Sequence, residues 1–404
     1  MFDLDELSLG DFFDLESCDY CGDCLSTCPE LGSRIIDPRA AIRALAGGLY
    51  VKEVLNKCSS CMTCNVTCPK DCNPYGLILY RWFERAKEKG YPVRAGLVMP
   101  LEPKNAWQNI MGNLPADESS MLEAWGDLER EELKGKALFA GCNLQILPYM
   151  AGSSLFSELP IFGRPDLCCG EVYYRMGALD KVQQVSDNLT RAYAETEMKE
   201  VVAYCQACYN ILKNVLPRHF GARFPFEVSY FGDILADKVL SGELDVKDRL
   251  KGMTVTLQDP CHSKLLGAEF RSRPRRILEH LGCEVREMKH NQEMSLCCGL
   301  GHGAARQNPF DMWFGIMRRL REARATKADA LVVYCNSCDL LFSVGTQVTP
   351  FMIPVRHLNE LVAEALGETL PRRNLSRARS MIAELFIKGA PSLLSRKRFQ
   401  PVSD

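Results

Sequence analysis

Two cysteine patterns in this chain have the residue types and spacing that bind metals. The first is a run of four cysteines that ends in Cys-Pro and occurs twice near the N-terminus. Its copies are Cys18, Cys21, Cys24 and Cys28, and Cys58, Cys61, Cys64 and Cys68. The second is a lone cysteine, a Cys-Cys-Gly and a Cys-x-x-Cys, in that order, also present twice. Its copies are Cys142, Cys168, Cys169, Cys205 and Cys208, and Cys261, Cys297, Cys298, Cys335 and Cys338. Because these groups hold 18 of the 20 cysteines, the chain is organised around metal–thiolate chemistry.

The N-terminal runs have the spacing of bacterial-type ferredoxins. In that pattern three closely spaced cysteines hold one cubane [4Fe–4S] cluster, and the fourth, before proline, reaches the other cluster. The predicted ligand sets are Cys18, Cys21, Cys24 and Cys68 for one cluster, and Cys58, Cys61, Cys64 and Cys28 for the other. Zinc, which also takes four thiolates, is the alternative, but two complete copies with a Cys-Pro favour iron.

The later pattern has more cysteines than one ordinary cluster requires. Adjacent residues cannot both face inward on regular secondary structure. We therefore expect each Cys-Cys-Gly on a turn, where glycine permits a backbone that other residues disfavour. A Cys-x-x-Cys alone could be a thioredoxin-like dithiol. The five-cysteine order, found twice, favours a metal centre.

This order resembles the CCG signature of heterodisulfide reductases and their relatives. With two ferredoxin runs on the same chain, the sequence from about Cys18 to Cys338 resembles the D-type subunit of that family, in which C-type and B-type subunits are fused. The resemblance implies a noncubane [4Fe–4S] cluster on each set of five cysteines, and hence four clusters in all. It also implies that the two noncubane clusters face each other and split a disulfide between them.

One spacing departs from the family pattern. The second copy has 35 and 36 residues between its elements, as the family does, but only 25 residues separate Cys142 from Cys168. We expect the loop there, and with it the substrate channel, to differ while the ligand count stays the same. Both motifs are intact, which favours a catalytic site over a pure relay.

Composition narrows the functional classes. A net charge of -2 gives no reason to expect a nucleic-acid partner. The acidic N-terminus lacks the features of a secretion signal, and no apolar run reaches the roughly 18 residues that cross a bilayer. In a reducing cytosol, 20 cysteines would not persist as disulfides. We therefore expect a cytoplasmic protein, which a partner could hold peripherally at the inner face of the membrane.

The fold class predicted is a multi-domain α+β protein. A small α-helical ferredoxin-like domain with two [4Fe–4S] clusters precedes duplicated α/β CCG domains. The predicted boundaries are 1–95 for the helical domain, 96–135 for a connector with one short helix at 121–128, 136–250 for the first CCG domain, and 251–404 for the second with its C-terminal helices. At 404 residues the chain exceeds one compact core.

Local patterns place the motifs on elements. Apolar runs at 137–142, 200–205, 253–258 and 330–335 predict buried, mainly parallel strands. Helices are predicted at 38–46, 76–90, 180–199 and 275–282. Because the later cysteines follow the apolar runs, we expect them in crevices at the carboxyl ends of strands.

Single residues support weaker hypotheses. His262 and His302 each follow a cysteine motif and could deliver protons to a leaving thiolate, with a structural histidine as the alternative. Cys72 is interpreted as a packed bystander near the second cubane cluster, and Cys283 as a buried strand residue. Arginine-rich stretches at 271–276 and 318–324 could dock a partner or an anionic substrate, with a solvated helix face as the alternative.

The predicted function is an iron–sulfur oxidoreductase that acts on sulfur groups as one subunit of a complex. Electrons would pass through the cubane clusters to the noncubane pair, and the resemblance implies reduction of a small disulfide, which takes two electrons and two protons. With no evident flavin or nicotinamide site, the chain needs an electron-donating subunit: a membrane cytochrome, a flavoprotein or an electron-transferring flavoprotein. The alternatives are a relay to a sulfite-, acyl-CoA- or hydroxy-acid-linked enzyme, and an assembly scaffold with structural metal sites.

Overall fold

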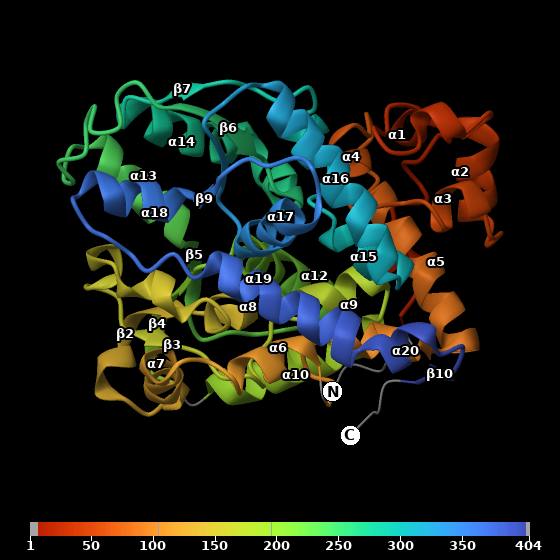
Figure 1. The fold of residues 1–404 in the computed structure, drawn as a ribbon. Helices are drawn as coiled ribbons and strands as arrows, with labels where there is room; N and C mark the ends of the chain where they lie inside the picture. The colour runs from red at the N-terminus through yellow and green to blue at the C-terminus, as the bar shows by residue number, and fades with distance from the viewer. Residues whose placement is uncertain (1–6, 104, 195, 401–404) are drawn as a thin grey trace.

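Two four-stranded parallel sheets and a helical N-terminal region make up the computed structural model (Figure 1), which describes residues 7–103, 105–194 and 196–400. Residues 1–6 and 401–404, at the ends of the first and last predicted domains, lie outside the described residues. The first sheet has the order β3-β2-β4-β5 and the second β7-β6-β8-β9. Their strands are β2 Gly135–Phe139, β3 Ile161–Phe162, β4 Met198–Ala203 and β5 Glu227–Tyr230, then β6 Thr254–Gln258, β7 Glu284–Val285, β8 Ala330–Val333 and β9 Val355–His357.

The two sheets have the same topology, which confirms the predicted duplication of a parallel α/β unit. All six strand pairs in them are parallel, and each unit runs from its first strand to one edge and then across to the other. All four predicted strands are present, each starting within two residues of the expected position. We call residues 135–240 the first half and residues 254–365 the second half.

The short Cys142–Cys168 spacing has a structural cause. In the second half a 14-residue helix, α14 Gly267–His280, lies between β6 and β7. In the first half the same connection holds only α8 Gly141–Gln145 and two 3-10 turns, Pro148–Gly152 and Ser154–Phe156. The first half thus lacks the counterpart of α14, and helix α7 Ala116–Gly126 packs against β3 and the first of these turns.

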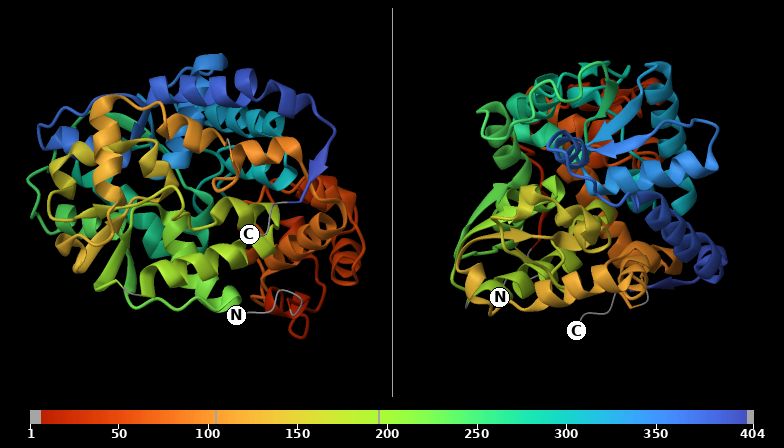
Figure 2. Two further views of the ribbon diagram at one scale, coloured as in Figure 1. Left: turned by 90° about the horizontal axis from the view of Figure 1, so that it is seen from below. Right: turned by 60° about the vertical axis from the view of Figure 1, so that its left-hand side comes forward.

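The N-terminal region is helical, as predicted. Its helices are α1 Asp23–Ser26, α2 Pro38–Ala46, α3 Lys52–Leu55, α4 Thr63–Val66 and α5 Pro74–Lys89. The Asp37 side chain accepts a hydrogen bond from the Ala40 amide and caps α2, with Pro38 in its first turn. Figures 1 and 2 show this region, in red and orange, at one end of the molecule.

The predicted connector is more structured than its composition suggests. In place of one short helix at 121–128 it forms α6 Ala106–Met111 and α7. Asn105 caps α6 through a hydrogen bond from the Gln108 amide, and α6 packs against α19 Asn374–Ile382, far along the chain. The connector is therefore part of the folded body, because several of its apolar side chains, including Trp107, Ile110 and Trp125, are buried.

The remaining helices cover the sheets, and the end of the chain returns to the N-terminal region. Strand β10 Arg398–Phe399 pairs antiparallel with β1 Tyr91–Pro92, which follows α5 (Figure 2). The buried apolar core extends from the N-terminal helices through the first sheet to Val332 and Leu358. The helices not yet given are α9 Glu171–Met176, α10 Leu179–Ala194, α11 Gln206–Asn210, α12 Leu216–Phe220, α13 Phe231–Leu240, α15 Leu300–Arg306, α16 Pro309–Ala325, α17 Asn336–Val348, α18 Leu358–Ala365 and α20 Ala390–Leu394.

Within the described residues, no helix combines the length and the apolar character needed to cross a bilayer.

Gly177 tests how closely the N-terminal region packs on the first half. It ends α9 at φ +69°, and a Cβ there would lie 2.6 Å from Trp82 Cβ and 2.9 Å from the Leu79 carbonyl oxygen of α5. We expect Gly177→Ala to lower stability by about 1–2 kcal/mol for the left-handed backbone and by about 1–3 kcal/mol more for the overpacking. The matched control is Gly242→Ala, because Gly242 has φ +81° and a Cβ added there would meet nothing within 4 Å. Denaturant unfolding that gave both variants the same midpoint would contradict the close packing.

Candidate functional site

The two N-terminal cysteine runs fold into matching loops. In the first, Tyr20 and Gly22 have φ values of +59° and +81°; in the second, Ser60 and Met62 have +56° and +63°. Each loop leads into a one-turn helix that carries the third cysteine, Cys24 in α1 and Cys64 in α4. Alternation with left-handed residues turns successive amide groups toward one side, a concavity that suits anions and iron–sulfur sites.

The fourth cysteine of each run lies with the other run. Burial and the nearby Cys68, Cys21 and Cys18 thiols raise the pKa of Cys24 to about 12. Burial and then Cys61 raise the pKa of Cys28 to about 12. The structure thus brings together the members of each predicted ligand set across the two runs, as the ferredoxin pattern requires. Their binding of iron stays a prediction.

Cys72 lies beside the set of Cys18, and not beside the set of Cys58 as expected. Its thiol pKa is raised to about 12 by burial and by the neighbouring Cys68 and Cys18 thiols, and its amide donates to Cys68 Sγ at 3.4 Å. The expectation that it lies near the second cubane cluster was wrong because Cys68, which it follows closely, belongs to the set of Cys18. Cys283 is buried, as expected, one residue before β7.

The later cysteines lie at the carboxyl ends of strands, as predicted. Cys142 follows β2, Cys205 follows β4, Cys261 follows β6 and Cys335 follows β8. Cys205 and Cys335 are the residues that precede helices α11 and α17. Helix N-termini favour nearby negative charge, so this placement suits thiolates.

Each Cys-Cys-Gly adopts the same local structure. Gly170 has φ +84° and its amide donates to Cys168 Sγ at 3.4 Å; Gly299 has φ +115° and its amide donates to Cys297 Sγ, also at 3.4 Å. Both glycines precede a helix, α9 and α15. The prediction of a turn that depends on glycine is confirmed, since an L side chain rarely adopts these φ values.

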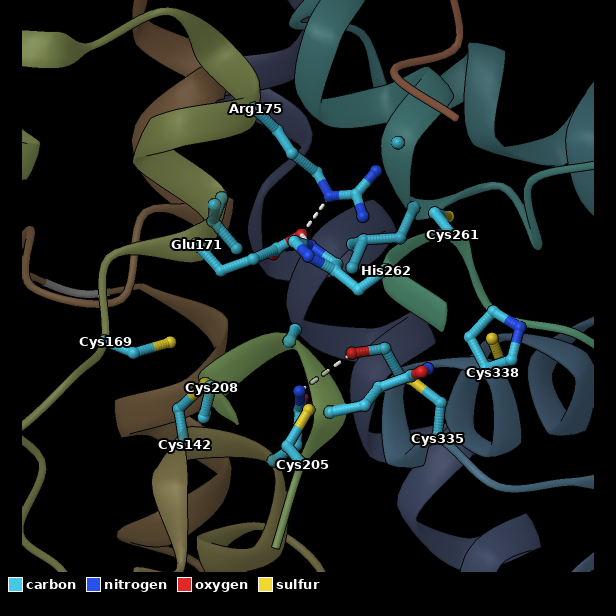
Figure 3. A pocket seen from close by; sticks show the side chains of 18 of the residues that line it. Cys142, Cys169, Glu171, Arg175, Cys205, Cys208, Cys261, His262, Cys335 and Cys338 are labelled. Carbon is cyan, nitrogen blue, oxygen red and sulfur yellow. Dashed lines mark hydrogen bonds and ion pairs between the residues drawn. The ribbon is translucent and has the colours of Figure 1, made fainter. Parts of the chain in front are cut away.

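The ten cysteines of the two halves converge on one pocket. Nine of them line it: Cys142, Cys168, Cys169, Cys205, Cys208, Cys261, Cys298, Cys335 and Cys338. The tenth, Cys297, shares a hydrogen bond with Cys261. A hydrogen bond with Cys205 of the first half raises the pKa of Cys335, in the second half, to about 11. Figure 3 shows the two groups facing each other.

The donor sets suit clusters of several irons. Each half offers five thiols, amide donors to sulfur and a buried setting, and soft thiolates are the ligands that iron–sulfur clusters take. Across the part of the chain that the structure describes, no three or more His, Cys, Asp or Glu side chains are grouped as the ligands of one metal ion.

One wall of the pocket is polar. His262 Nε2 lies 3.0 Å from Glu171 Oε1, and the Arg175 guanidinium pairs with the same oxygen (Figure 3). Behind this wall, Asn210 Nδ2 lies 3.1 Å from His262 Nδ1. Burial opposes charge on Glu171, but the Arg175 charge and the His262 hydrogen bond lower its pKa to about 2. In the second half the residue that matches Glu171 is Leu300, so the two sides of the pocket differ.

The two candidate histidines have different positions. His262 lines the pocket, as its hypothesis requires. His302 is not among the lining residues; its Nε2 lies 3.4 Å from Glu30 Oε1, beside the first ferredoxin run. Its position suits a structural histidine between the N-terminal region and the second half.

The second ferredoxin loop is tied to the site by three cationic side chains. Arg175 Nη1 donates to the Ser60 carbonyl at 2.7 Å, Lys264 Nζ donates to Thr63 Oγ1 at 2.8 Å, and Arg306 Nε donates to the Cys58 carbonyl at 3.3 Å. Cys61 packs in one apolar cluster with Cys261, Cys297 and Cys298. Cys18 and Cys21, by contrast, are partly exposed.

Apart from the cysteines and His262, sequence reasoning missed the residues that line the pocket, among them Glu171, Arg175, Trp107, Asn143 and Ser337. Trp107 comes from α6, and its Nε1 lies 3.5 Å from Asn143 Oδ1; Asn143 Nδ2 donates to Ser337 Oγ of the other half at 2.8 Å. Asn143 follows Cys142 as His262 follows Cys261, so aligning the two copies could have found it. No signal pointed to Trp107.

The arginine-rich stretches are largely internal ion pairs. Arg275 bonds to Asp259 and Glu287, Arg273 to Asp233, and the fully buried Arg319 to Glu322. Because these charges are already matched by carboxylates, they do not form a docking patch, whereas Arg321 and Arg324 are exposed, as the alternative of a solvated helix face expects.

Comparisons with known proteins give similarities over most of the chain. The family model for a cysteine-rich domain, CCG, matches residues 151–213 and 255–343. The D subunit of the dihydromethanophenazine:CoB–CoM heterodisulfide reductase of Methanosarcina barkeri is 26% identical over 90% of this chain and 97% of its own length. The B subunit of the fumarate reductase (CoM/CoB) of Methanothermobacter marburgensis is 26% identical over 81% of this chain and 67% of its own. EtfAB:quinone oxidoreductase of Syntrophomonas wolfei is 24% identical over 74% of this chain and 50% of its own.

The Arg175–Glu171 pair predicts a large, non-additive effect on stability. Both side chains are nearly buried, so Arg175→Met leaves a carboxylate without its counter-charge. We expect Arg175→Met to cost about 3–5 kcal/mol, and the double change with Glu171→Gln to cost less than the sum of the two single changes. Denaturant unfolding measures all three.

The control is Arg249→Met, which removes an exposed pair with Asp245 and should change stability by at most about 1 kcal/mol. Additive losses at Arg175 and Glu171 would show that the two groups do not depend on each other.

Proposed function

Because the chain is a CCG-domain iron–sulfur protein that resembles the D-type subunits of heterodisulfide reductases, we propose that it reduces a small disulfide in the pocket between its two halves. Two of its relatives are named as subunits of redox enzymes, and this chain is likewise a redox electron-transfer subunit. The acceptor, the ligand sets and the number of clusters are the parts that we propose.

One observation carries the proposal. Two complete sets of five cysteines, from two copies of one fold, meet around a single pocket and touch through Cys205 and Cys335. A disulfide has two sulfur atoms, and reducing it takes two electrons. A site with two equivalent metal centres facing one space can receive one sulfur on each side.

Four [4Fe–4S] clusters are assigned to the chain. The cubane sets are Cys18, Cys21, Cys24 and Cys68, and Cys58, Cys61, Cys64 and Cys28; the noncubane sets are Cys142, Cys168, Cys169, Cys205 and Cys208, and Cys261, Cys297, Cys298, Cys335 and Cys338. When bound, such clusters supply one-electron carriers and iron that binds sulfur.

The exposure of the N-terminal cysteines indicates which of the two cubane sets faces the electron donor. Cys18 and Cys21 are partly exposed, which suits them to the donor side. Cys61 is buried with Cys261 and Cys297, so the second cubane set adjoins the second half. We therefore propose that the set of Cys18 would hold the cluster nearer the electron donor, and the set of Cys58 the cluster nearer the second half and the pocket.

The pocket walls orient the substrate and keep water out. Trp107 and Leu300 are nearly buried and give the pocket apolar surface. The lining also carries the polar side chains of His262, Glu171 and Arg175, which hold one another in place. An unsymmetrical pocket of this kind suits a disulfide whose two halves differ.

The proposed partner is an electron-donating subunit: a membrane cytochrome, a flavoprotein or an electron-transferring flavoprotein. Any of these could hold the chain peripherally at the inner face of the membrane.

Disulfide reduction by the purified, chemically reduced and cluster-loaded chain tests this proposal. We expect thiol release with the parent protein, and a loss of at least about 100-fold in Cys335→Ala, since a residue of the reacting constellation is removed. Cys283→Ala is the control, because Cys283 is buried but outside every set. A parent protein that releases no thiol from any disulfide offered, yet passes electrons to a second enzyme, would leave the relay to a sulfite-, acyl-CoA- or hydroxy-acid-linked acceptor as the function.

The exchange of the fourth cysteine has its own test. Cys68→Ala removes a ligand of the set of Cys18, so about four irons of the total should be lost or the cluster degraded. Cys72→Ala, which removes the thiol next to it, should keep the full iron content. Iron and acid-labile sulfide analysis of both variants tests whether Cys68 is the fourth ligand of this set. Iron loss in Cys72→Ala but not in Cys68→Ala would show that Cys72 is the ligand instead. If the parent protein contained much less iron than four clusters require, the alternative of an assembly scaffold with structural metal sites would be favoured.

A further inference from the structure

A second pocket lies away from the cysteine-lined one, where three distant parts of the chain meet. It has a volume of about 250 Å³ and is built from α5 and the segment after it, from α15 and α16, and from β10. Four guanidinium groups line it, those of Arg85, Arg94, Arg306 and Arg398. Asp311 is the one carboxylate among the lining residues that the structure describes.

Three of the four guanidinium groups are held in place by partners that carry no negative charge. Arg94 Nε donates to the Gln307 carbonyl at 2.7 Å, and Arg398 Nε donates to the Lys89 carbonyl at 2.6 Å. The Arg85 guanidinium lies 4.3 Å from the centre of the Tyr50 ring. Carbonyl and aromatic partners position a guanidinium but carry no opposing unit charge.

The one lining carboxylate, Asp311, pairs with the fourth guanidinium group, that of Arg306, and so offsets one of the four positive charges. Asp311 Oδ1 lies 3.7 Å from Arg306 Nη1, too long for a direct hydrogen bond. Burial and then the charge of Arg398 lower the pKa of Arg85, against a smaller opposing effect of Glu88. Such a pocket has an excess of positive charge that a bound anion would relieve.

We infer that this pocket is a binding site for a small multivalent oxyanion, a phosphate-bearing or polycarboxylate metabolite. Guanidinium groups present paired N–H donors that match the oxygens of phosphate and carboxylate. The volume exceeds what a single water or chloride needs and is close to the range of small-molecule sites. Tyr50, Asn56 and Asn308 add polar groups to the lining.

Arg306 connects this pocket with the redox site. Its side chain is 12% exposed, and it donates to the carbonyls of Lys57 and Cys58 as well as lining the pocket. An anion beside it adds negative charge near the set of Cys58 and makes reduction there less favourable. This coupling, unlike the binding itself, rests on the proposed function.

Calorimetric titration of the full cluster-loaded chain with pyrophosphate and with citrate tests the site. Arg85→Met and Arg398→Met should each weaken binding by about tenfold or more, the effect of losing one charge-assisted contact. The matched control is Arg276→Met, because Arg276 is 52% exposed, lies outside the pocket and pairs with Glu269; it should bind as the parent does. Binding of pyrophosphate alone identifies a phosphate ligand, and binding of citrate alone a polycarboxylate.

Three results would overturn parts of this inference. The anion site is contradicted if neither anion binds the folded parent at millimolar concentration. It is also contradicted if the parent and both pocket variants bind equally well. Anion binding is expected to shift the reduction potential of the clusters to a lower value. If the anion binds and the potential does not change, the pocket is not coupled to the redox site. A cooperative thermal unfolding transition in each variant is the control that it is folded. Since calorimetry needs no disulfide, failure of disulfide reduction with intact anion binding would count against the proposed function alone.

Discussion

The burial of ten thiols between the carboxyl ends of two parallel sheets is the constraint on which the rest of the structure depends. Thiols this close together cannot all ionise in a low-dielectric interior, and hydrogen bonds with neighbouring thiols accordingly raise the pKa of Cys335 and of Cys208. The fold answers with groups that favour negative sulfur: the amides of Gly170 and Gly299, and helices that begin just after Cys205 and Cys335. Bound iron would supply the remaining positive charge.

The same constraint explains how the N-terminal region is attached. Its second cysteine loop is held by Arg175, Lys264 and Arg306, whose donors reach two backbone carbonyls and a hydroxyl of that loop. These contacts join segments that are far apart in sequence, 115 residues in the case of Arg175 and Ser60. A redox path requires such fixed proximity between its sites, and the buried cations provide it while leaving Cys18 and Cys21 toward the outside.

Much of this arrangement could be predicted from local sequence. The apolar runs before Cys142, Cys205, Cys261 and Cys335 predicted the strands, and a parallel sheet then fixes which end the cysteines occupy. Glycine after each Cys-Cys pair predicted the turn because few residues tolerate φ near +84° or +115°. Which cysteine set Cys72 lies beside, and that α6 contributes Trp107 to the pocket, could not be predicted, since both depend on tertiary packing. Neither could the arginine pocket, where Arg94 meets the carbonyl of Gln307, 213 residues away.

Electron paramagnetic resonance of the reduced, cluster-loaded chain, titrated with disulfides, tests the central claim most directly. If the two five-cysteine sets form one disulfide-reducing site, a disulfide should change the signals of the noncubane clusters, leave those of the cubane clusters in place, and lose its effect in Cys335→Ala. Signals that no disulfide perturbs, in a chain that holds all four clusters, would contradict the claim.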